Sequence, residues 1–439
     1  MNIERDIRKQ LLAWKVNPAR KPLVLQGARQ VGKTWLLKDF GKQEFDSMAY
    51  FSFDEDPELK QFFKSTKDVS RIIQNLALVY GKPIMPGKTL IIFDEIQECN
   101  EALNSLKYFC DNAPEYAVAS AGSLLGVALS RGESFPVGKV DFIDMHPITF
   151  TEFLKVSDEG LAAFCNSNFP IEPIPDLLFS RLVDKFKMYL ISGGMPEAVT
   201  ALLEKQDLEL TQTVLSNILR ANTLDFSKHT EYKDIVKIGY VWASIPAQLA
   251  RENKKFLYQA AKPGARAREY EDALGWLEHA GLVHKIYRNT TPGLPLSRFD
   301  DLSSFKLYLY DVGLLRRMSF LDPIAIKEGN RLFTEFKGSL SENYILQSII
   351  TQFEVVPRYW SSGNQAEVDF LIQYQNQIIP VEVKSGESIR GKSLSLYRKQ
   401  FQPSISIRFS LQNLRLDNGL LIIPLFLADQ TKRILEEIE

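Results

Sequence analysis

The stretch Gly27-Ala-Arg-Gln-Val-Gly-Lys33-Thr34 decides the fold of the first part of this chain. It matches the pattern GxxxxGK[ST] in full, between an apolar run at 22–26 and a helical pattern that begins WLLKDF. Strand, glycine-rich loop and helix is the context in which this pattern binds phosphate, because loop N–H groups and the positive helix end face the oxygens. The expected nucleotide-binding residues are Gly27, Ala28, Arg29, Gln30, Val31, Gly32, Lys33 and Thr34.

A second run, Thr89-Leu-Ile-Ile-Phe-Asp94-Glu95, supplies the acids that such a site needs. Four apolar residues followed by two carboxylates indicate a buried strand that ends at the ligand. Lys33 is expected to reach the β- and γ-phosphates, and the Thr34 hydroxyl to ligate Mg²⁺. Asp94 suits a water-mediated Mg²⁺ ligand, and Glu95 suits the base that polarises an attacking water. The predicted cofactors are therefore ATP and Mg²⁺, with Lys33 and Glu95 as catalytic residues.

Alternating strands and helices continue through residue 150. Further strands are expected at 48–53, 116–119 and 140–143, and helices at 58–63, 69–80 and 101–110. This alternation predicts an α/β fold with a parallel sheet covered by helices on both faces. Ser123 follows the fourth strand at the edge where ligands bind. Two roles stay open for it: a hydrogen bond that senses the γ-phosphate, and the N-cap of the next helix.

Several motifs together resemble a known family. They are GARQVGKT, LIIFDEIQ, YLISGGMPE (189–197), IPAQL (245–249) and FKLYLYDVGLL (305–315). The chain resembles a prokaryotic family of AAA+-type ATPases that carry a C-terminal domain of unknown function related to restriction-endonuclease-like nucleases. The likeness runs from about residue 5 to about residue 430. It implies an AAA+-like core at 1–150 and a helical lid at 151–220. AAA+ relatives often form rings, which leaves a homo-oligomer as an open alternative for this chain.

One position departs from that family. Gly138-Lys139 stands where relatives commonly have Gly-Arg, and a lysine does not offer the planar fork of an arginine. If relatives use this position as an arginine finger, hydrolysis here is slower or depends on Arg131. We favour the simpler interpretation that Arg131 and Lys139 lie on a solvated surface loop. In the lid, Gly193-Gly194 most simply marks the end of a helix.

Residues 221–325 predict three helices followed by two strands, the order of a winged helix, which is a frequent nucleic-acid-binding module. A basic segment at 251–268 holds six cations against Glu252, a balance of 6 − 1 = +5. Its cations are Arg251, Lys254, Lys255, Lys262, Arg266 and Arg268. Phosphate binding explains this segment. Docking of a protein, or a brace for the ATPase domain, explains it as well.

Residues 326–439 carry a second set of acids: Glu342 on a predicted helix, Asp369 on a strand, and Glu382-Val-Lys384 on the next strand. This is the arrangement of PD-(D/E)xK nucleases, in a restriction-endonuclease-like α/β domain. Residues i and i+2 of a strand share a face, and antiparallel pairing brings Asp369 beside Glu382. Glu342, Asp369 and Glu382 are the predicted Mg²⁺ ligands, and Lys384 orients the attacking water. The alternatives are an ordinary amphipathic strand and a nuclease-type fold that only binds a partner.

The composition sets the outer limits. The chain has 439 residues, 45% of them hydrophobic and 24% charged, with a net charge of −1, which argues against a disordered or fibrous protein. Three cysteines and four scattered histidines make a disulfide framework or a zinc site unlikely to form. No run of 18 apolar residues occurs, so we expect a cytoplasmic protein without a membrane partner. A second local basic excess, 6 − 2 = +4 at 380–410, leaves DNA or RNA as possible partners.

The leading hypothesis is an ATPase coupled to a nuclease-like domain that acts on or binds nucleic acid. The rival hypothesis is a nucleotide-switched binding or signalling protein whose nuclease-like domain does not cut.

Overall fold

The computed structural model describes residues 1–438 apart from 124–125, 128–134, 168–169, 228–231, 329–330, 364–365 and 386–390, and not the side chains of 232 and 331–336. Arg131 therefore lies outside the described residues. The chain forms two compact units. One comprises Glu4–His146 and Gly275–Leu282, and the other comprises Met1–Ile3, Pro147–Leu274 and Val283–Glu439. No helix of the described residues has the length and apolar character needed to cross a membrane.

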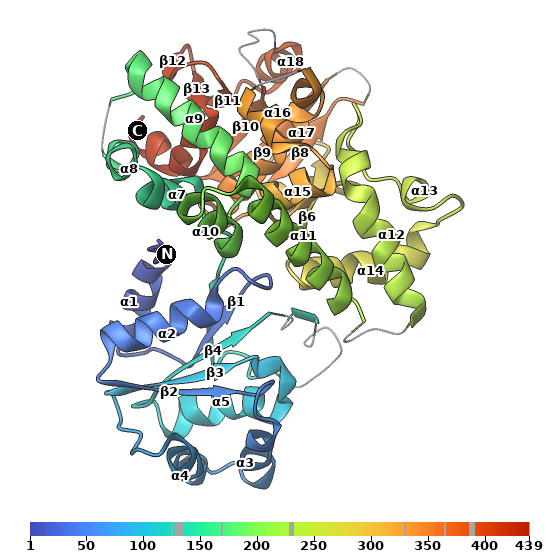
Figure 1. The fold of residues 1–439 in the computed structure, drawn as a ribbon. Helices are drawn as coiled ribbons and strands as arrows, with labels where there is room; N and C mark the ends of the chain where they lie inside the picture. The colour runs from blue at the N-terminus through green and yellow to red at the C-terminus, as the bar shows by residue number, and fades with distance from the viewer. Residues whose placement is uncertain are drawn as a thin grey trace. The chain divides into compact units, whose positions relative to one another are not determined.

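The first unit contains a five-stranded sheet in the order β2-β3-β4-β1-β5 (Figure 1). Its strands are β1 (Leu23–Gln26), β2 (Ser47–Ser52), β3 (Thr89–Asp94), β4 (Ala117–Gly122) and β5 (Asp141–Asp144). All neighbouring strands pair in parallel, which confirms the predicted parallel sheet. Because β1 lies between β4 and β5 and runs parallel to both, the loop that follows it opens at the carboxyl edge of the sheet, close to the end of β4.

Helices cover both faces of this sheet (Figure 1). They are α1 (Arg8–Val16), α2 (Lys33–Glu44), η1 (Pro57–Leu59), α3 (Lys60–Ser65), α4 (Val69–Tyr80), η2 (Ile96–Glu98) and α5 (Asn100–Asn112). On one face, Ile91 and Phe93 of β3 form a buried core with Ile72 of α4 and Leu106 of α5. Residues i and i+2 of a strand share a face, so this alternation leaves the opposite face of β3 to α2.

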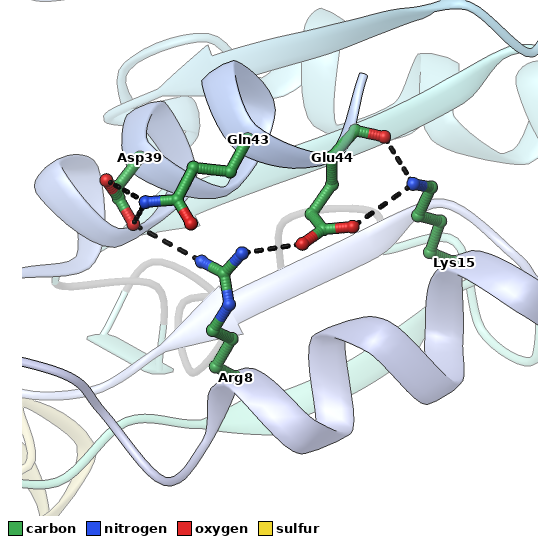
Figure 2. Close-up of polar contacts among 5 residues, drawn as sticks. All are labelled: Arg8, Lys15, Asp39, Gln43 and Glu44. Carbon is green, nitrogen blue, oxygen red and sulfur yellow. Dashed lines mark hydrogen bonds and ion pairs between the residues drawn. The ribbon is translucent and has the colours of Figure 1, made fainter.

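Helix α1 is fastened to α2 by ion pairs, as Figure 2 shows. The Arg8 guanidinium lies 2.6 Å from a Glu44 oxygen and 3.3 Å from Asp39. Lys15 lies 3.3 Å from the other Glu44 oxygen and also donates to the Glu44 carbonyl. Gln43 reinforces the end of the cluster by donating to Asp39 at 2.9 Å. The first helix of the chain thereby supports the helix that follows the glycine-rich loop.

The second unit begins with a group of helices. They are α7 (Phe150–Ser157), α8 (Glu159–Asn166), α9 (Asp176–Ser192), α10 (Pro196–Glu204) and α11 (Leu208–Asp225). Gly193 ends α9 with φ 64°, and a Cβ there would stand 2.2 Å from Asp311 Oδ1. Asp311 accepts from the Gly194 N–H at 2.7 Å and from the Leu314 N–H at 2.9 Å. The two glycines therefore mark a helix end, as expected. They also connect the 189–197 motif to the 305–315 motif, because both pack closely against Asp311.

The remaining elements follow in chain order. They are α12 (Tyr232–Leu249), α13 (Tyr258–Ala261), α14 (Ala267–His279), β6 (Val283–Asn289), η3 (Leu296–Phe299), β7 (Asp300–Leu309), α15 (Val312–Met318), α16 (Pro323–Glu328), α17 (Arg331–Ile349), β8 (Arg358–Ser361), β9 (Glu367–Tyr374), β10 (Gln377–Val383), α18 (Lys392–Phe401), β11 (Ser406–Ser410), β12 (Arg415–Asp417), β13 (Leu420–Pro424), η4 (Leu425–Gln430) and α19 (Thr431–Glu436). The segment predicted as a winged helix contains α12, α13 and α14, the antiparallel pair β6–β7 and, after that pair, α15.

That antiparallel pair belongs to a larger sheet. Eight strands form the order β12-β13-β11-β10-β9-β8-β6-β7, and β6 pairs in parallel with β8. The predicted domain boundary at 325/326 therefore separates strands that belong to one continuous sheet. The composition of the sequence gives no sign that this sheet spans the boundary. The division into segments 1–150, 151–220, 221–325 and 326–439 stays a prediction.

Candidate functional site

The glycine-rich loop lies between the end of β1 and the start of α2, as predicted. Its backbone turns sharply, with φ 148° at Gly27, 64° at Gln30 and 100° at Gly32. A Cβ at Gly27 would stand 2.2 Å from the Met145 carbonyl oxygen, so only glycine fits there. The loop is therefore a cradle of backbone N–H groups in front of a helix N-terminus, which suits the phosphates of a nucleotide.

Lys33 projects into this loop. Its amine donates to the carbonyl oxygens of Gly27 and Ala28, each at 2.8 Å, and its residue is only 6% exposed. Burial lowers the pKa of Lys33 to about 8, against the opposing effect of Glu95 and Asp94. A cation held only by backbone carbonyls suits phosphate oxygens as further partners.

Thr34 and Asp94 meet across the loop. The Thr34 hydroxyl lies 2.9 and 3.0 Å from the two Asp94 oxygens. Tyr50 of β2 donates its hydroxyl to Asp94 at 2.8 Å, and burial together with Asp94 raises the pKa of Tyr50. Hydroxyl and carboxylate oxygens are the ligands that Mg²⁺ prefers, so this pair fits the predicted metal.

Glu95 stands just beyond the strand end, in a left-handed conformation with φ 48°. Its carboxylate accepts from Gln97 at 2.5 Å and from the Ser123 hydroxyl at 3.1 Å. The partners orient the acid without neutralising it, which suits a base that polarises water. The Ser123 hydroxyl thus belongs to the polar network around Glu95. The alternative N-cap role involves residues 124–125, which lie outside the described residues.

Sequence reasoning missed Tyr50, Gln97 and Arg5. The Arg5 guanidinium donates to the Val31 carbonyl at 3.1 Å and to the His146 carbonyl at 2.6 Å. It thereby connects the glycine-rich loop to the segment that follows β5. Only the pairing of β2 with β3 could have suggested Tyr50, since its own segment carries no motif.

Lys139 sits in an exposed ion pair with Asp111 at 2.7 Å. This matches the surface-loop interpretation of Lys139.

The predicted acids of the last segment occupy α17, β9 and β10. Val381 pairs with Phe370, so Glu382 and Asp369 both lie one residue beyond the last pair of the antiparallel β9–β10 register. Glu342 forms an ion pair with Lys254 and accepts from the Tyr308 hydroxyl at 3.2 Å. Burial disfavours the charge on Glu342, but Lys254 and Lys306 outweigh it and lower its pKa.

Asp369 has the opposite electrostatics. Burial raises the pKa of Asp369 to about 7, and the charge on Glu342 adds to the rise. The Asp369 carboxylate accepts from the Val383 N–H at 2.7 Å. Lys306 is fully buried nearby and forms an ion pair with Glu367.

Glu382 is satisfied by other cations. Arg408, its neighbour across β10 and β11, lies 2.9 Å from one oxygen, and Lys384 lies 3.3 Å from the other. The three predicted metal ligands thus divide between two sets of cations. Throughout the described residues, no group of three or more His, Cys, Asp or Glu side chains is placed to hold a metal ion. The second set of acids does not fit a metal in this form.

Comparisons with known proteins bear on both regions. Residues 19–154 match the family model AAA_14, described as an AAA domain. This segment is an AAA-type P-loop ATPase domain. Residues 183–325 and 337–427 match two domains of unknown function, DUF8612 and DUF4143. Neither description mentions a nuclease or a winged helix. A search among curated proteins returned no match.

Solved structures give weak overall likenesses. The Walker-type ATPase PABY2304 of Pyrococcus abyssi is 14% identical with a TM-score of 0.47, and the match covers 72% of this chain and 96% of that one. The RuvB Holliday junction branch migration motor of Thermotoga maritima is 14% identical with a TM-score of 0.29, covering 64% and 89%. AMPPCP-bound DnaA of Aquifex aeolicus is 16% identical with a TM-score of 0.24, covering 62% and 85%. These scores are too low to bear on the function of this chain.

Proposed function

We propose that this protein is a cytoplasmic ATPase that binds Mg-ATP at the Gly27–Thr34 loop and hydrolyses it. The observation that carries the proposal is the meeting of the Thr34 hydroxyl and the Asp94 carboxylate within 3.0 Å at the mouth of the loop. Glu95 follows directly and is oriented by neutral donors. The proximity of the loop, Thr34, Asp94 and Glu95 at one edge of the sheet supports the proposal, because phosphoryl transfer to water needs a phosphate cradle, metal ligands and a base together.

Each residue then has a distinct task. The loop N–H groups and the Lys33 amine bind the phosphates, and Thr34 and Asp94 hold the metal ion. Bound Mg²⁺ supplies positive charge to the phosphate oxygens. Glu95 takes the proton of the attacking water, and Ser123 and Gln97 keep its carboxylate in place.

Replacement of Lys33 tests this proposal. Lys33→Ala should lose tight ATP binding and turnover, because the phosphates lose their charged partner. Lys42→Ala is the matched control, since Lys42 is an exposed lysine on the same helix. Equilibrium binding of ATP and release of phosphate measure both steps. Wild-type turnover in the Lys33 variant would contradict the assignment.

We further propose that the ATPase governs a nuclease-like C-terminal domain that contacts DNA or RNA. The basic segment 251–268 and the winged-helix order of α12, α13, α14 and β6–β7 support contact with phosphates. The sequence order of Glu342, Asp369, Glu382 and Lys384 supports the nuclease-like fold. Binding to a labelled oligonucleotide should weaken steeply with salt; salt-independent binding would contradict phosphate contact.

A specific observation favours the second candidate, a nucleotide-switched binding or signalling protein. Cations from the chain itself pair with Glu342 and Glu382. In this form the domain is suited to holding a partner rather than to cutting it. Cleavage assays with Mg²⁺ or Mn²⁺, with and without ATP, separate the candidates. Cutting that disappears in Asp369→Ala supports the nuclease, and salt-dependent binding without cutting supports the switch.

The proposal includes a homo-oligomer, by analogy with AAA+-type ATPases. Sedimentation of the protein with and without ATP tests it, and a monomer under both conditions would contradict it.

A further inference from the structure

Lys254 reaches the acidic centre from an exposed loop. It lies between α12 and α13, and its neighbours Arg251, Glu252 and Asn253 are exposed. The side chain of Lys254 is nevertheless only 15% exposed, because its amine pairs with the Glu342 carboxylate, which is 7% exposed. A lysine in a surface loop has thus turned inward to meet a buried acid.

The other cations near these acids belong to strands or their ends. Lys306 lies on β7, is fully buried, and pairs with Glu367. Arg408 lies on β11 between β10 and β13 and pairs with Glu382. The backbones of Lys306 and Arg408 are held in the eight-stranded sheet, whereas the backbone of Lys254 lies in a loop between two helices, the kind of segment that opens at low free-energy cost.

The charges show what its departure would do. With Asp369 protonated, the charged acids Glu342 and Glu367 stand against Lys254 and Lys306, so the formal balance is −2 + 2 = 0. Without Lys254 the balance becomes −1. Uncompensated buried charge is unfavourable, and a divalent cation that prefers carboxylate oxygens would relieve it.

We propose that Lys254 is a tethered counter-ion that closes the Glu342–Asp369 centre to divalent cations. The inference rests on the nuclease-like domain proposed above and adds how its acids are regulated. Phe256 is buried and its N–H bonds the Phe305 carbonyl at 2.8 Å, so the segment that can open is 250–255. Opening of this segment is then the event that admits a metal. The contact is autoinhibitory, because the Lys254 amine neutralises the Glu342 carboxylate that a metal ion would otherwise bind.

Binding of Mn²⁺ to the nucleotide-free full chain tests the proposal. Lys254→Met should bind Mn²⁺ about tenfold more tightly than the wild type, because a competing buried cation is gone. Lys255→Met removes the same charge one residue along the loop and should behave like the wild type. The gain should vanish in Lys254→Met/Asp369→Asn and persist in Lys254→Met/Asp94→Asn, which separates this centre from the P-loop.

Thermal unfolding controls for loss of fold. Mn²⁺ should raise the melting temperature of Lys254→Met and leave that of the wild type unchanged. Equal Mn²⁺ binding by the two proteins would overturn the proposal, as would a gain in Lys254→Met that does not depend on Asp369. ATP turnover and oligonucleotide binding on the same preparations report on the proposed function separately, so either can fail without the other.

Discussion

Two pairs of acids in this chain are surrounded in opposite ways. At the P-loop, Asp94 and Glu95 accept hydrogen bonds from a threonine, a tyrosine, a glutamine and a serine, all neutral donors. In the second unit, Glu342 and Glu382 are paired with Lys254, Arg408 and Lys384.

The difference concerns what each site can still bind. Neutral donors orient a carboxylate and leave its charge available to a metal ion or a proton. In a buried ion pair the charge of the carboxylate is already compensated by a cation, and removal of that cation leaves the buried carboxylate uncompensated. The first site is therefore prepared for an incoming ligand, whereas the second is complete without one.

The largest effect should follow from replacing the proposed base. Glu95→Gln should lower ATP turnover by about 100-fold or more, because a general base typically contributes that much. ATP affinity should change little, since Glu95 is hydrogen-bonded to Gln97 and Ser123, which are not residues of the phosphate-binding loop. Glu101→Gln, an exposed acid at the start of α5, is the control. Phosphate release and equilibrium ATP binding measure the two quantities; loss of both together would remove Glu95 from the role of base.

The second centre should respond in stability. Arg408→Met leaves the buried Glu382 without its closest cation and should lower the free energy of unfolding by about 3–5 kcal/mol. Arg415→Met removes an exposed ion pair with Asp417 and should cost at most about 1 kcal/mol. Urea unfolding measures both variants. Equal losses would mean that Glu382 is not a buried charge.

Asp369 predicts a pH dependence of stability. Its pKa in the folded protein, raised to about 7, exceeds the usual value, so the folded state keeps a proton that the unfolded state has lost. Stability from this residue is therefore present at low pH and is lost as the pH rises toward 7. Asp369→Asn should remove this loss, and its stability relative to wild type should improve by about 1 kcal/mol or more between pH 5 and pH 8. Parallel pH profiles would contradict a buried, protonated Asp369.

The smallest effect is expected at Lys384. Its side chain is 34% exposed and lies 3.3 Å from Glu382, so solvent screens the pair. Lys384→Ala should change the free energy of unfolding by less than about 1 kcal/mol. A loss as large as that of Arg408→Met would show that both cations are needed to neutralise Glu382.

The placement of the glycine-rich loop between β1 and α2, and of two acids at the end of β3, could be predicted because the pattern is local. Gly27–Thr34 and the strand that ends in Asp94 and Glu95 carry their roles in consecutive residues. Arg5 and Tyr50 could not be predicted in the same way. Their roles arise only when distant segments fold against the loop and against β3.

For the C-terminal centre, the sequence predicted which elements carry the acids but not which cations pair with them. The positions of Asp369 and Glu382 on paired strands follow from the alternation of the sequence. Their surroundings do not, because Lys254 lies 88 residues from Glu342 along the chain and Arg408 lies 26 residues from Glu382. Likewise, nothing in the sequence of β6 and β7 indicates that they extend the C-terminal sheet.

Counting bound Mn²⁺ tests the contrast between the two sites most directly. Wild-type protein titrated with Mn²⁺ in the presence of a non-hydrolysable ATP analogue should bind one ion per chain, and Asp94→Asn should weaken that site. A second ion per chain that is lost in Asp369→Asn would contradict the account, because the second centre would then be open.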